Sequence, residues 1–575
     1  MDKKTHVEPV DRLVHASEAR LTSGMSPSSA MEAYLDWVVH FLNSPGKQSE
    51  LIRDAAANSA AFTAYLARAA SGKDSTPIIE PEPRDRRFSA PEWQKMPFAA
   101  IYQSFLMLEQ SWHHATCGVE GVSKHHLDMA DFAARQILDM MSPSNFPATN
   151  PQILAKIRET GGMNLVRGFQ NFLEDWQRAV LKEPPAGAEN FRVGKEVAVT
   201  PGKVVYRNRL IELIQYTPTT KTVRPEPILI VPAWIMKYYI LDLSPHNSMV
   251  KYLVDQGHTV FMISWHNPTE EDRDLGMDDY ITSGVVSALE AVRKIVPDQK
   301  VHTVGYCIGG TLLSIAAAAL GRDGKDWLAS VTLFAAQTDF TEAGELMLFI
   351  DDSQVSFLED MMWEQGYLDA KQMAGAFQML HSNDLVWSRA VHDYLMGERR
   401  PIIDLMAWNA DATRMPYRMH SEYLRHLFLD NDFIEGRCVV GDGAVSVTDI
   451  HVPIFEVGAE KDHVAPWKSV FKINLLADTD VTFLLTSGGH NAGIISEPGH
   501  PHRHFRISTA KEGETYVSPD DWLEQTPVQD GSWWPTWEAW LSERSGTPVK
   551  PPAMGNPKAG LVPICDAPGS YVLEK

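Results

Sequence analysis

A cysteine lies between two glycines where an apolar stretch meets a predicted helix. The motif reads Gly305-Tyr306-Cys307-Ile308-Gly309. It has the Gly-x-nucleophile-x-Gly spacing of a strand-to-helix turn, in which glycines two residues to either side of the nucleophile prevent a collision. The helix N-terminus favours a thiolate, and the N–H of Ile308 can face a developing oxyanion. We therefore predict that Cys307 is a nucleophile; the alternative is a buried structural cysteine in a glycine turn.

Two later loops offer the acid and the base that such a nucleophile requires. Around this type of turn the chain order is nucleophile, acid, histidine, each in a loop that follows a strand. Asp462 follows the apolar stretch 451–458, and His490 follows the stretch 481–485. We predict that Asp462 and His490 complete a catalytic triad with Cys307. His463, next to Asp462, could compete for a catalytic role. We expect instead that it supports the triad residues without being one of them.

Other histidines and cysteines raise the question of a metal. His500, His502 and His504 alternate along the chain, and the choice lies between a metal site and a surface loop. Their proline neighbours favour the loop. The four cysteines are far apart and form no Cys-x-x-Cys pair, so neither a disulfide framework nor a zinc site of linked cysteines is expected. We predict no metal.

The surrounding pattern predicts an α/β domain over residues 191–575. Predicted strands alternate with helices at 249–255 and 279–295; the strands are 204–216, 227–232, 257–265, 300–306, 330–334, 451–458 and 481–485. Apolar strands that alternate with helices indicate a parallel sheet covered on both faces. Residues 339–447 interrupt the alternation with Met-, Trp- and Leu-rich helical spacing. We predict a helical cap insertion there; the alternative is a second, independent helical domain.

Residues 1–190 predict an all-α N-terminal domain. Helical apolar spacing runs to about residue 75 and returns from 92 to about 182, with a proline-rich, charged linker at 76–87. Its expected core contains Tyr102, Phe105, Leu106, Leu108 and Trp112. Together with the nucleophile turn, these patterns predict an α/β-hydrolase fold with a helical cap, preceded by an all-α domain.

Composition excludes some functions. The formal net charge is −22, which argues against nonspecific nucleic-acid binding, although a local basic patch could still hold an anionic ligand. The longest apolar run, 312–320, is far shorter than the ~20 residues that span a bilayer. The first residues are polar and unlike a secretory signal. We expect a cytoplasmic protein with no transmembrane segment.

The three predicted active-site segments resemble those of polyhydroxyalkanoate synthases. They are residues 305–311, 461–466 and 487–493. Residues 237–243, 408–413, 423–426 and 533–537 also resemble that family, so the similarity covers about 90–550. A chain of this length with its own N-terminal helical module resembles the class I and II enzymes, and class I is the expectation here. The first 90 residues match only loosely. Trp234 and Met236 stand where the family often has a small residue and Asn, so the second oxyanion donor, for which Trp234 is the candidate, stays open.

The resemblance implies an acyltransferase that polymerises (R)-3-hydroxyacyl-CoA, chiefly 3-hydroxybutyryl-CoA, into polyester. Cys307 would carry the acyl group, and coenzyme A would be the leaving group, with no cofactor. The resemblance further implies a homodimer, association with polymer granules, and a helical N-terminal domain that serves one or both. Two alternatives remain: a cysteine-dependent α/β-hydrolase such as an acyl-CoA thioesterase, and a non-catalytic polymer-coat protein with a vestigial turn.

Overall fold

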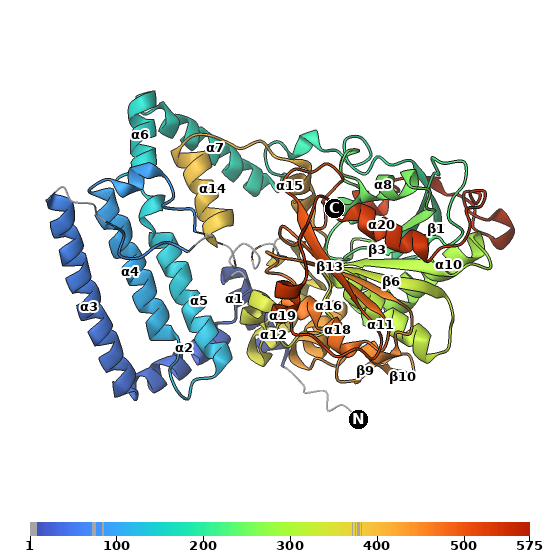
Figure 1. Ribbon diagram of the computed structural model, residues 1–575, viewed down its shortest axis with the longest axis horizontal. Helices are drawn as coiled ribbons and strands as arrows, with labels where there is room; N and C mark the ends of the chain where they lie inside the picture. Colours follow the sequence, from blue (N-terminus) through green and yellow to red (C-terminus); the bar gives the residue numbers. More distant parts are fainter. Residues whose placement is uncertain are drawn as a thin grey trace. The chain divides into compact units, whose positions relative to one another are not determined.

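The apolar strands of the computed structural model assemble into one sheet, whose order is β14-β13-β12-β11-β6-β5-β3-β4-β2-β1-β15 (Figure 1). The strands are β1 (Gly202–Arg207), β2 (Ile211–Tyr216), β3 (Ile228–Val231), β4 (Val260–Trp265), β5 (Val301–Tyr306), β6 (Leu328–Phe334), β11 (Ile454–Ala459), β12 (Val481–Thr486), β13 (His504–Ala510), β14 (Gln529–Asp530) and β15 (Cys565–Asp566). The six central strands run parallel. Every residue of β3, β4 and β5 is buried, as a sheet covered on both faces requires.

Helices cover both faces of this sheet. Val304 and Tyr306 of β5 share a core with α8 and α20, whereas Gly305 between them lies against Gly310 of α11. Successive strand residues point to opposite faces, so α11 lies on the face away from α8 and α20. The helices of this part are α8 (Met249–Asp255), α9 (Met277–Asp279), α10 (Ser287–Ile295), α11 (Ile308–Arg322), α17 (Trp467–Phe471), α18 (Ile473–Leu476), α19 (Pro519–Gln525) and α20 (Trp534–Glu543). The α/β-hydrolase fold is confirmed.

The structure describes residues 8–22, 24–71, 76–82, 85–370, 372–373, 375, 380 and 382–575. The chain divides into two compact units. The sheet unit contains 8–18, 187–370 and 402–575. The helical unit contains the described residues of 19–186 and 371–401. Among the described helices, none is both long and apolar enough to cross a membrane.

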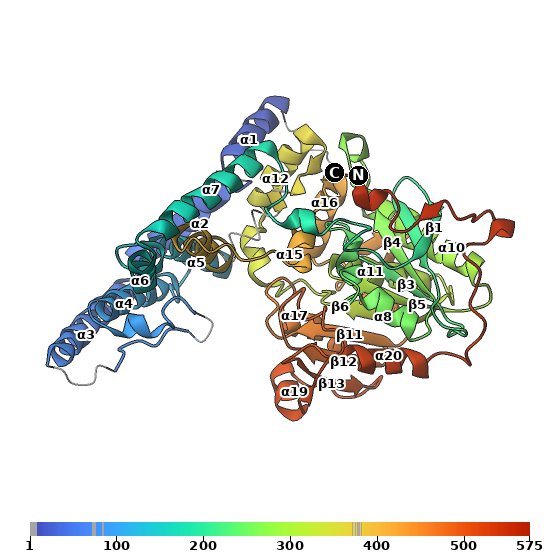
Figure 2. The ribbon, with the colours of Figure 1, turned by 90° about the horizontal axis from the view of Figure 1, so that it is seen from above.

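In the helical unit α4 packs between α3 and α5, and α2 packs against α5 (Figures 1 and 2). The helices of this unit are α2 (Pro27–Leu42), α3 (Pro45–Ala70), α4 (Phe98–Thr116), α5 (Lys124–Met141), α6 (Pro151–Thr160), α7 (Met163–Leu181) and α14 (Ser388–Ala390). Tyr102, Phe105 and Leu106 are buried, as predicted. Leu108 and Trp112 are 46% and 41% exposed, so their assignment to the core was wrong.

The proline-rich stretch 76–87 is not a free linker. The side-chain oxygen of Gln103 accepts from the N–H groups of Ile78 and Ile79, at 2.7 and 3.0 Å, and its amide donates to the Ile79 carbonyl. Phe88 follows in the core. The described part of this stretch therefore packs on α4 as an element of the helical unit.

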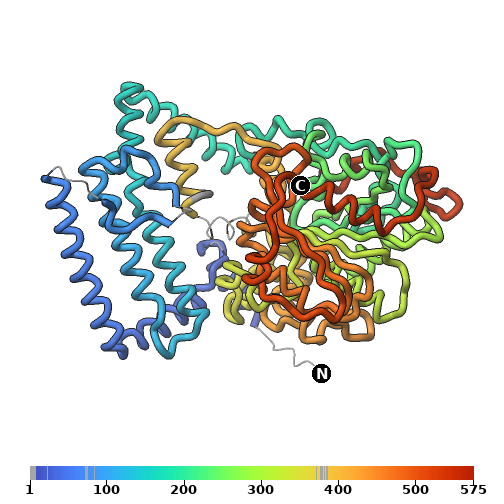
Figure 3. Tube along the Cα trace, viewed as in Figure 1, coloured from blue at the N-terminus to red at the C-terminus, as the bar shows by residue number. Residues whose placement is uncertain are grey.

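The insertion 339–447 is divided between the units, which corrects the expected boundaries. Its elements in the sheet unit include α12 (Asp352–Gln365), α15 (Asp404–Asn409), α16 (Tyr417–Tyr423) and the short strands β7 (Tyr367–Leu368), β8 (Met415–Pro416), β9 (Cys438–Val440) and β10 (Gly443–Val445). Residues 382–401 instead pack with α7: Asn164 donates to the Leu395 carbonyl at 2.7 Å, and Gly168 has no room for a side chain beside Tyr394. Figure 3 shows these residues, in gold, beside the blue-green helices. Apolar spacing indicates that a helix must be buried, but not against which neighbour.

Two further expectations were wrong in detail. The stretch 204–216 forms the hairpin β1–β2, because the Asn208 side chain accepts from the N–H groups of Leu210 and Ile211 and turns the chain. His504 does not lie in a surface loop: it begins β13, which pairs antiparallel with β12. His500 and His502 lie in the turn that precedes β13, as the loop prediction has it.

Candidate active site

Cys307 occupies a strained turn between β5 and α11. Its backbone angles are φ 54° and ψ −131°, a region that non-glycine residues rarely adopt. Its N–H donates to the Phe334 carbonyl at 2.8 Å, and its carbonyl accepts from the N–H of Gly310 at 2.8 Å. Ile308 follows as the first residue of α11, where N–H groups have no partner within the helix. The turn thus has the conformation that the motif predicts.

The flanking glycines leave no room for side chains. A Cβ added to Gly305 would lie 2.3 Å from Cα of Gly310. One added to Gly309 would lie 2.4 Å from the Pro232 carbonyl oxygen and 2.5 Å from that of Val231. The first turn of α11 therefore lies directly against the end of β3 and the start of the loop that follows it.

Asp462 and His490 meet at the same edge of the sheet. Nδ1 of His490 is 2.7 Å from Oδ2 of Asp462, and Oδ1 of Asp462 accepts from the N–H groups of Val464 and Ala465, each at 2.9 Å. The Asp462 side chain is fully buried. Burial disfavours the charged form of His490, but the charges of Asp462 and Cys307 raise its pKa well above the ordinary value. The structure thus brings Cys307, Asp462 and His490 together.

The loop that carries His490 is held by two tryptophans. Nε1 of Trp533 donates to the Gly493 carbonyl, and Nε1 of Trp534 donates to the Ile494 carbonyl, both at 3.0 Å. The hydroxyl of Tyr306 donates to the side chain of Asn491. Both tryptophans lie in the segment 533–537, which was singled out only for its resemblance to the family; a buried indole N–H that needs an acceptor is the signal that could have indicated more.

The loop 232–237, which follows β3, lies beside the nucleophile turn. The carbonyl of Pro232 accepts from Nε1 of Trp265 at 2.9 Å. The carbonyl of Trp234 accepts from Oγ1 of Thr413 at 2.7 Å, and that of Ile235 accepts from the Thr413 N–H at 3.1 Å. Trp234 lies in the expected loop, and its side chain is buried. Its role as an oxyanion donor stays a prediction. Thr413 lies in the segment 408–413 that resembles the family, but no contact with this loop was predicted for it.

The part of the insertion that belongs to the sheet unit supplies an aromatic wall. Tyr423, at the end of α16, packs edge-on against Trp234 with ring centres 5.9 Å apart. Burial raises the pKa of Tyr423 well above its usual value, and the nearby Cys307 raises it further. His463 is partly exposed in the Asp462 loop, and its predicted role is untested. Tyr423 begins the segment 423–426 that resembles the family, but no role at the site was predicted for it.

Two clusters among the described residues have the donor spacing of a metal site. One is formed by His113, Cys117 and Asp131, the other by His426, Asp430 and Asp432. Neither contains a residue of the predicted triad. Carboxylates, imidazoles and a thiol often gather on a surface without a metal, so we assign none here.

The chain matches models of known protein families. A family described as "Poly-beta-hydroxybutyrate polymerase (PhaC) N-terminus" matches residues 84–253, and "Poly-beta-hydroxybutyrate polymerase N terminal" matches residues 5–47. The latter extends the resemblance into the first 90 residues, where only a loose similarity was expected. The "alpha/beta hydrolase fold" family matches residues 226–474.

Several curated relatives are similar over most of the chain. A poly(3-hydroxyalkanoate) polymerase of Methylorubrum extorquens is 40% identical over 508 residues, 88% of this chain and 83% of the relative. Polymerase subunits of Rhizobium etli and Rhizobium meliloti are each 38% identical, over 86% and 85% of this chain and 78% and 79% of their own length. This chain belongs to the poly(3-hydroxyalkanoate) polymerase family. It is therefore an enzyme of the acyltransferase type.

Proposed function

We propose that this member of the polymerase family converts (R)-3-hydroxyacyl-CoA, chiefly 3-hydroxybutyryl-CoA, into polyester with release of coenzyme A. Cys307, His490 and Asp462 are the proposed triad. The observation that carries the proposal is the 2.7 Å contact between His490 and Asp462 beside a strained nucleophile turn. In this fold such an arrangement supports acyl transfer through a covalent intermediate.

The first step is acylation of Cys307. His490 takes the proton of the thiol, and the buried Asp462 holds the imidazole in the tautomer that can accept it. The thiolate attacks the thioester carbonyl, and the N–H of Ile308 stabilises the oxyanion together with a donor from the loop 232–237. The carbonyl then re-forms, and coenzyme A leaves with the proton that His490 held. Exchange of one thioester for another is nearly balanced in energy, so Cys307 can pass the acyl group on.

The second step is chain growth. The 3-hydroxyl of another hydroxyacyl unit gives its proton to His490 and attacks the acyl-Cys307 carbonyl. An ester bond forms, the bond to sulfur breaks, and Cys307 regains the proton from His490. The ester is lower in energy than the thioester, which drives polymerisation.

Water must be kept from the acyl-enzyme, because hydrolysis would make the protein a thioesterase. Trp234 and Tyr423, both buried beside the turn, support such exclusion. We propose that the cap elements of the sheet unit cover Cys307 and move when substrate enters or polymer leaves. This aromatic wall favours the polymerase over the hydrolase.

The helical unit offers an apolar surface for association. Phe169, Phe172, Trp176 and Val180 of α7 are all at least 45% exposed. Large exposed apolar residues on one helix commonly mark a contact with another protein or an apolar phase. We propose that this unit serves association with the polymer granule in the cytoplasm and formation of a homodimer. Mass measurement in solution tests the dimer.

One assay tests the reaction. The purified protein is incubated with 3-hydroxybutyryl-CoA while coenzyme A release is followed and the product is collected. Polymer is the expected product. Free 3-hydroxybutyrate would indicate the thioesterase, and no coenzyme A release would indicate a non-catalytic coat protein.

A further inference from the structure

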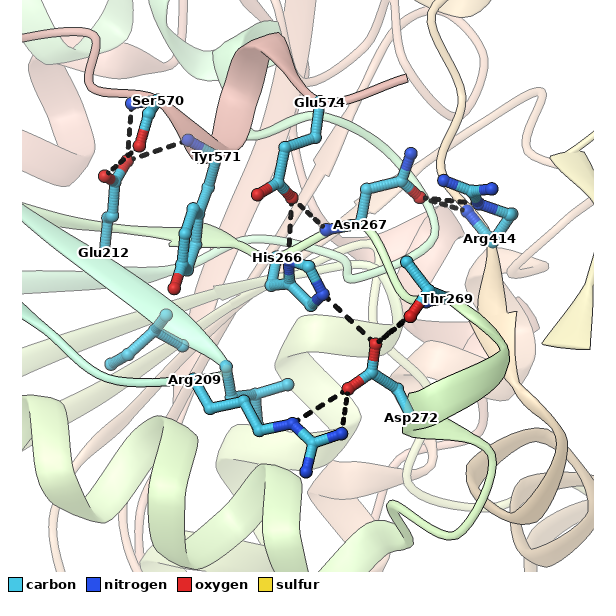
Figure 4. A network of polar contacts seen from close by, with 12 residues as sticks. Arg209, Glu212, His266, Asn267, Thr269, Asp272, Arg414, Ser570, Tyr571 and Glu574 are labelled. Carbon is cyan, nitrogen blue, oxygen red and sulfur yellow. Dashed lines mark hydrogen bonds and ion pairs between the residues drawn. The ribbon is translucent and has the colours of Figure 1, made fainter. Parts of the chain in front are cut away.

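The C-terminal residues 570–574, here called the tail segment, return to the edge of the sheet that carries the candidate active site. The chain first pairs β15 with β1. The N–H groups of Ser570 and Tyr571 then donate to the carboxylate of Glu212, at 2.9 and 3.0 Å (Figure 4). Glu212 is fully buried and also pairs with Arg207. The tail segment is therefore fixed on β2 before it passes β4.

Glu574 joins the tail segment to the loop that follows β4. Its Oε2 lies 2.7 Å from Nδ1 of His266 and accepts from the N–H of Asn267 at 2.8 Å (Figure 4). Nε2 of His266 lies 3.1 Å from Oδ2 of Asp272. The hydrogen bond to Glu574 raises the pKa of His266, although burial opposes this. Burial disfavours the charged form of Glu574, yet His266 and Asn267 hold its pKa below the usual value. His266 thus bridges two carboxylates.

The tail segment also supplies acceptors for Lys237, the last residue of the loop 232–237. The Lys237 side chain is buried, and its Nζ donates to the carbonyl of Glu574 at 2.8 Å and to that of Tyr571 at 3.3 Å. Burial lowers the pKa of Lys237 to about 8. A buried ammonium is costly unless its donors are satisfied, so the loop is stable here only while the tail segment is in place.

These contacts close into a ring. Oδ1 of Asn267 accepts from the N–H of Arg414 at 3.0 Å. The preceding residue, Thr413, donates to the carbonyls of Trp234 and Ile235. Lys237 of the loop 232–237 donates to the main-chain carbonyl of Glu574, and the carboxylate of Glu574 accepts from the N–H of Asn267. Asn267 in turn accepts from Arg414, whose neighbour Thr413 donates back to the loop and closes the ring. A closed ring of hydrogen bonds fixes a loop more tightly than contacts at one end.

We propose that Glu574 is a positioning residue for acyl transfer: its carboxylate ties the tail segment to His266 and Asn267, which keeps the main-chain carbonyls of the tail segment in place for Lys237. It thereby sets the place of the loop 232–237, and hence of the second oxyanion donor. This inference rests on the proposed function, in which that loop stabilises the oxyanion. Glu574 itself touches no reacting atom. Its loss should therefore lower the rate of acylation and leave substrate binding and the thiol unchanged.

The test compares Glu574→Ala and Glu574→Gln with Asp566→Ala, which removes an exposed carboxylate that precedes the tail segment. Coenzyme A release is measured in single turnovers over a range of 3-hydroxybutyryl-CoA concentrations. Glu574→Ala should lower the limiting rate of acylation by about 10- to 100-fold, with the half-saturating concentration changed by less than about twofold. Glu574→Gln keeps an acceptor for Asn267 and should lose less. Asp566→Ala should match the unaltered chain.

A second measurement separates positioning from general damage. Alkylation of Cys307 by iodoacetamide needs His490 but not the oxyanion loop, so its rate should be the same in all variants. Wild-type acylation in Glu574→Ala, or an equal loss of acylation and alkylation, would overturn the proposal. If the unaltered chain releases no coenzyme A, the proposed function fails by itself. In that case hydrogen exchange of residues 232–241 tests the positioning role by itself. Faster exchange there in Glu574→Ala, with exchange of β5 unchanged, supports the role of Glu574, and unchanged exchange of 232–241 refutes that role.

Discussion

The two sides of the proposed oxyanion site are held in different ways. The turn at Cys307 is fixed by its own sequence, because Gly305 and Gly309 lie where any side chain would collide with main-chain atoms. The loop 232–237 is fixed by partners far along the chain: Thr413, Trp408, whose indole donates to the Lys237 carbonyl, and the tail segment. One side is a local motif, and the other exists only after the whole sheet unit has folded.

This difference explains which side could be predicted. A motif that places a side chain by steric exclusion carries its geometry in five consecutive residues. A loop held by residues some 170 to 340 positions away carries no such signature. Substitutions on the two sides should therefore have different effects. Those at the turn should abolish the reaction or destabilise the fold, and those at the loop should lower the rate of acylation.

The largest effect is expected at the nucleophile. Cys307→Ala should abolish acyl-enzyme and polymer, a loss of at least about 10³-fold, because no other thiol lies in the turn. Cys307→Ser should retain little activity, since an alcohol is a poorer nucleophile at neutral pH. His490→Gln should block acylation as well. Coenzyme A release and mass spectrometry of the acyl-enzyme measure these losses, with melting temperature as the control for folding. Substantial turnover in Cys307→Ala would remove the whole assignment.

The next largest effect is expected from one methyl group in the turn. In Gly309→Ala the new Cβ meets the main chain of Val231 and Pro232, which must shift because neither atom belongs to a flexible side chain. The shift would move the turn against the loop, so we expect about a 10²-fold loss of acylation and a lower melting temperature. Gly46→Ala is the matched variant: no heavy atom lies within 4 Å of its Cβ, so this variant should fold and react normally. Equal behaviour of the two would contradict the steric argument.

The rest of the molecule divides in the same way, into features that local sequence encodes and features that distant contacts decide. The central strands and the order Cys307, Asp462, His490 follow from apolar runs and from loops next to them, and the structure has them there. The place of residues 382–401 and the ring around Glu574 depend on which distant surfaces meet, and apolar spacing does not encode this. His504 was placed in a loop because of the prolines nearby, but it begins β13, where it pairs with Asp530 of β14, a partner that no local pattern indicates.

A more selective effect, with a smaller loss of acylation, is expected at Asp462. In Asp462→Asn the side-chain oxygen can still accept from Val464 and Ala465, but the amide facing His490 disfavours the tautomer that accepts a proton. A thiolate at a helix N-terminus can form in part without that help, whereas the hydroxyl of the second unit cannot. We expect elongation to fall by about 10²-fold or more and acylation by about 10-fold. Pre-steady-state coenzyme A release separates the two steps, and equal losses would refute this division.

The smallest effect is expected at Thr413, on the loop side of the comparison. Thr413→Val keeps the shape of the side chain and the N–H bond to Ile235 but removes the hydroxyl that donates to the Trp234 carbonyl. A buried carbonyl that loses its donor costs about 1–3 kcal/mol, enough to let the loop leave its place part of the time. Acylation should fall by about 10-fold, with iodoacetamide reactivity of Cys307 unchanged. Thr413→Ser restores the hydroxyl and should restore most of the rate.

A double variant tests whether Thr413 and Glu574 act through one ring. The fold-loss of acylation in Thr413→Val/Glu574→Ala should be smaller than the product of the two single fold-losses. In Thr413→Val combined with Asp566→Ala, the two effects on acylation should be additive in free energy. Independent losses at Thr413 and Glu574 would show that the loop is held by separate contacts and not by a ring.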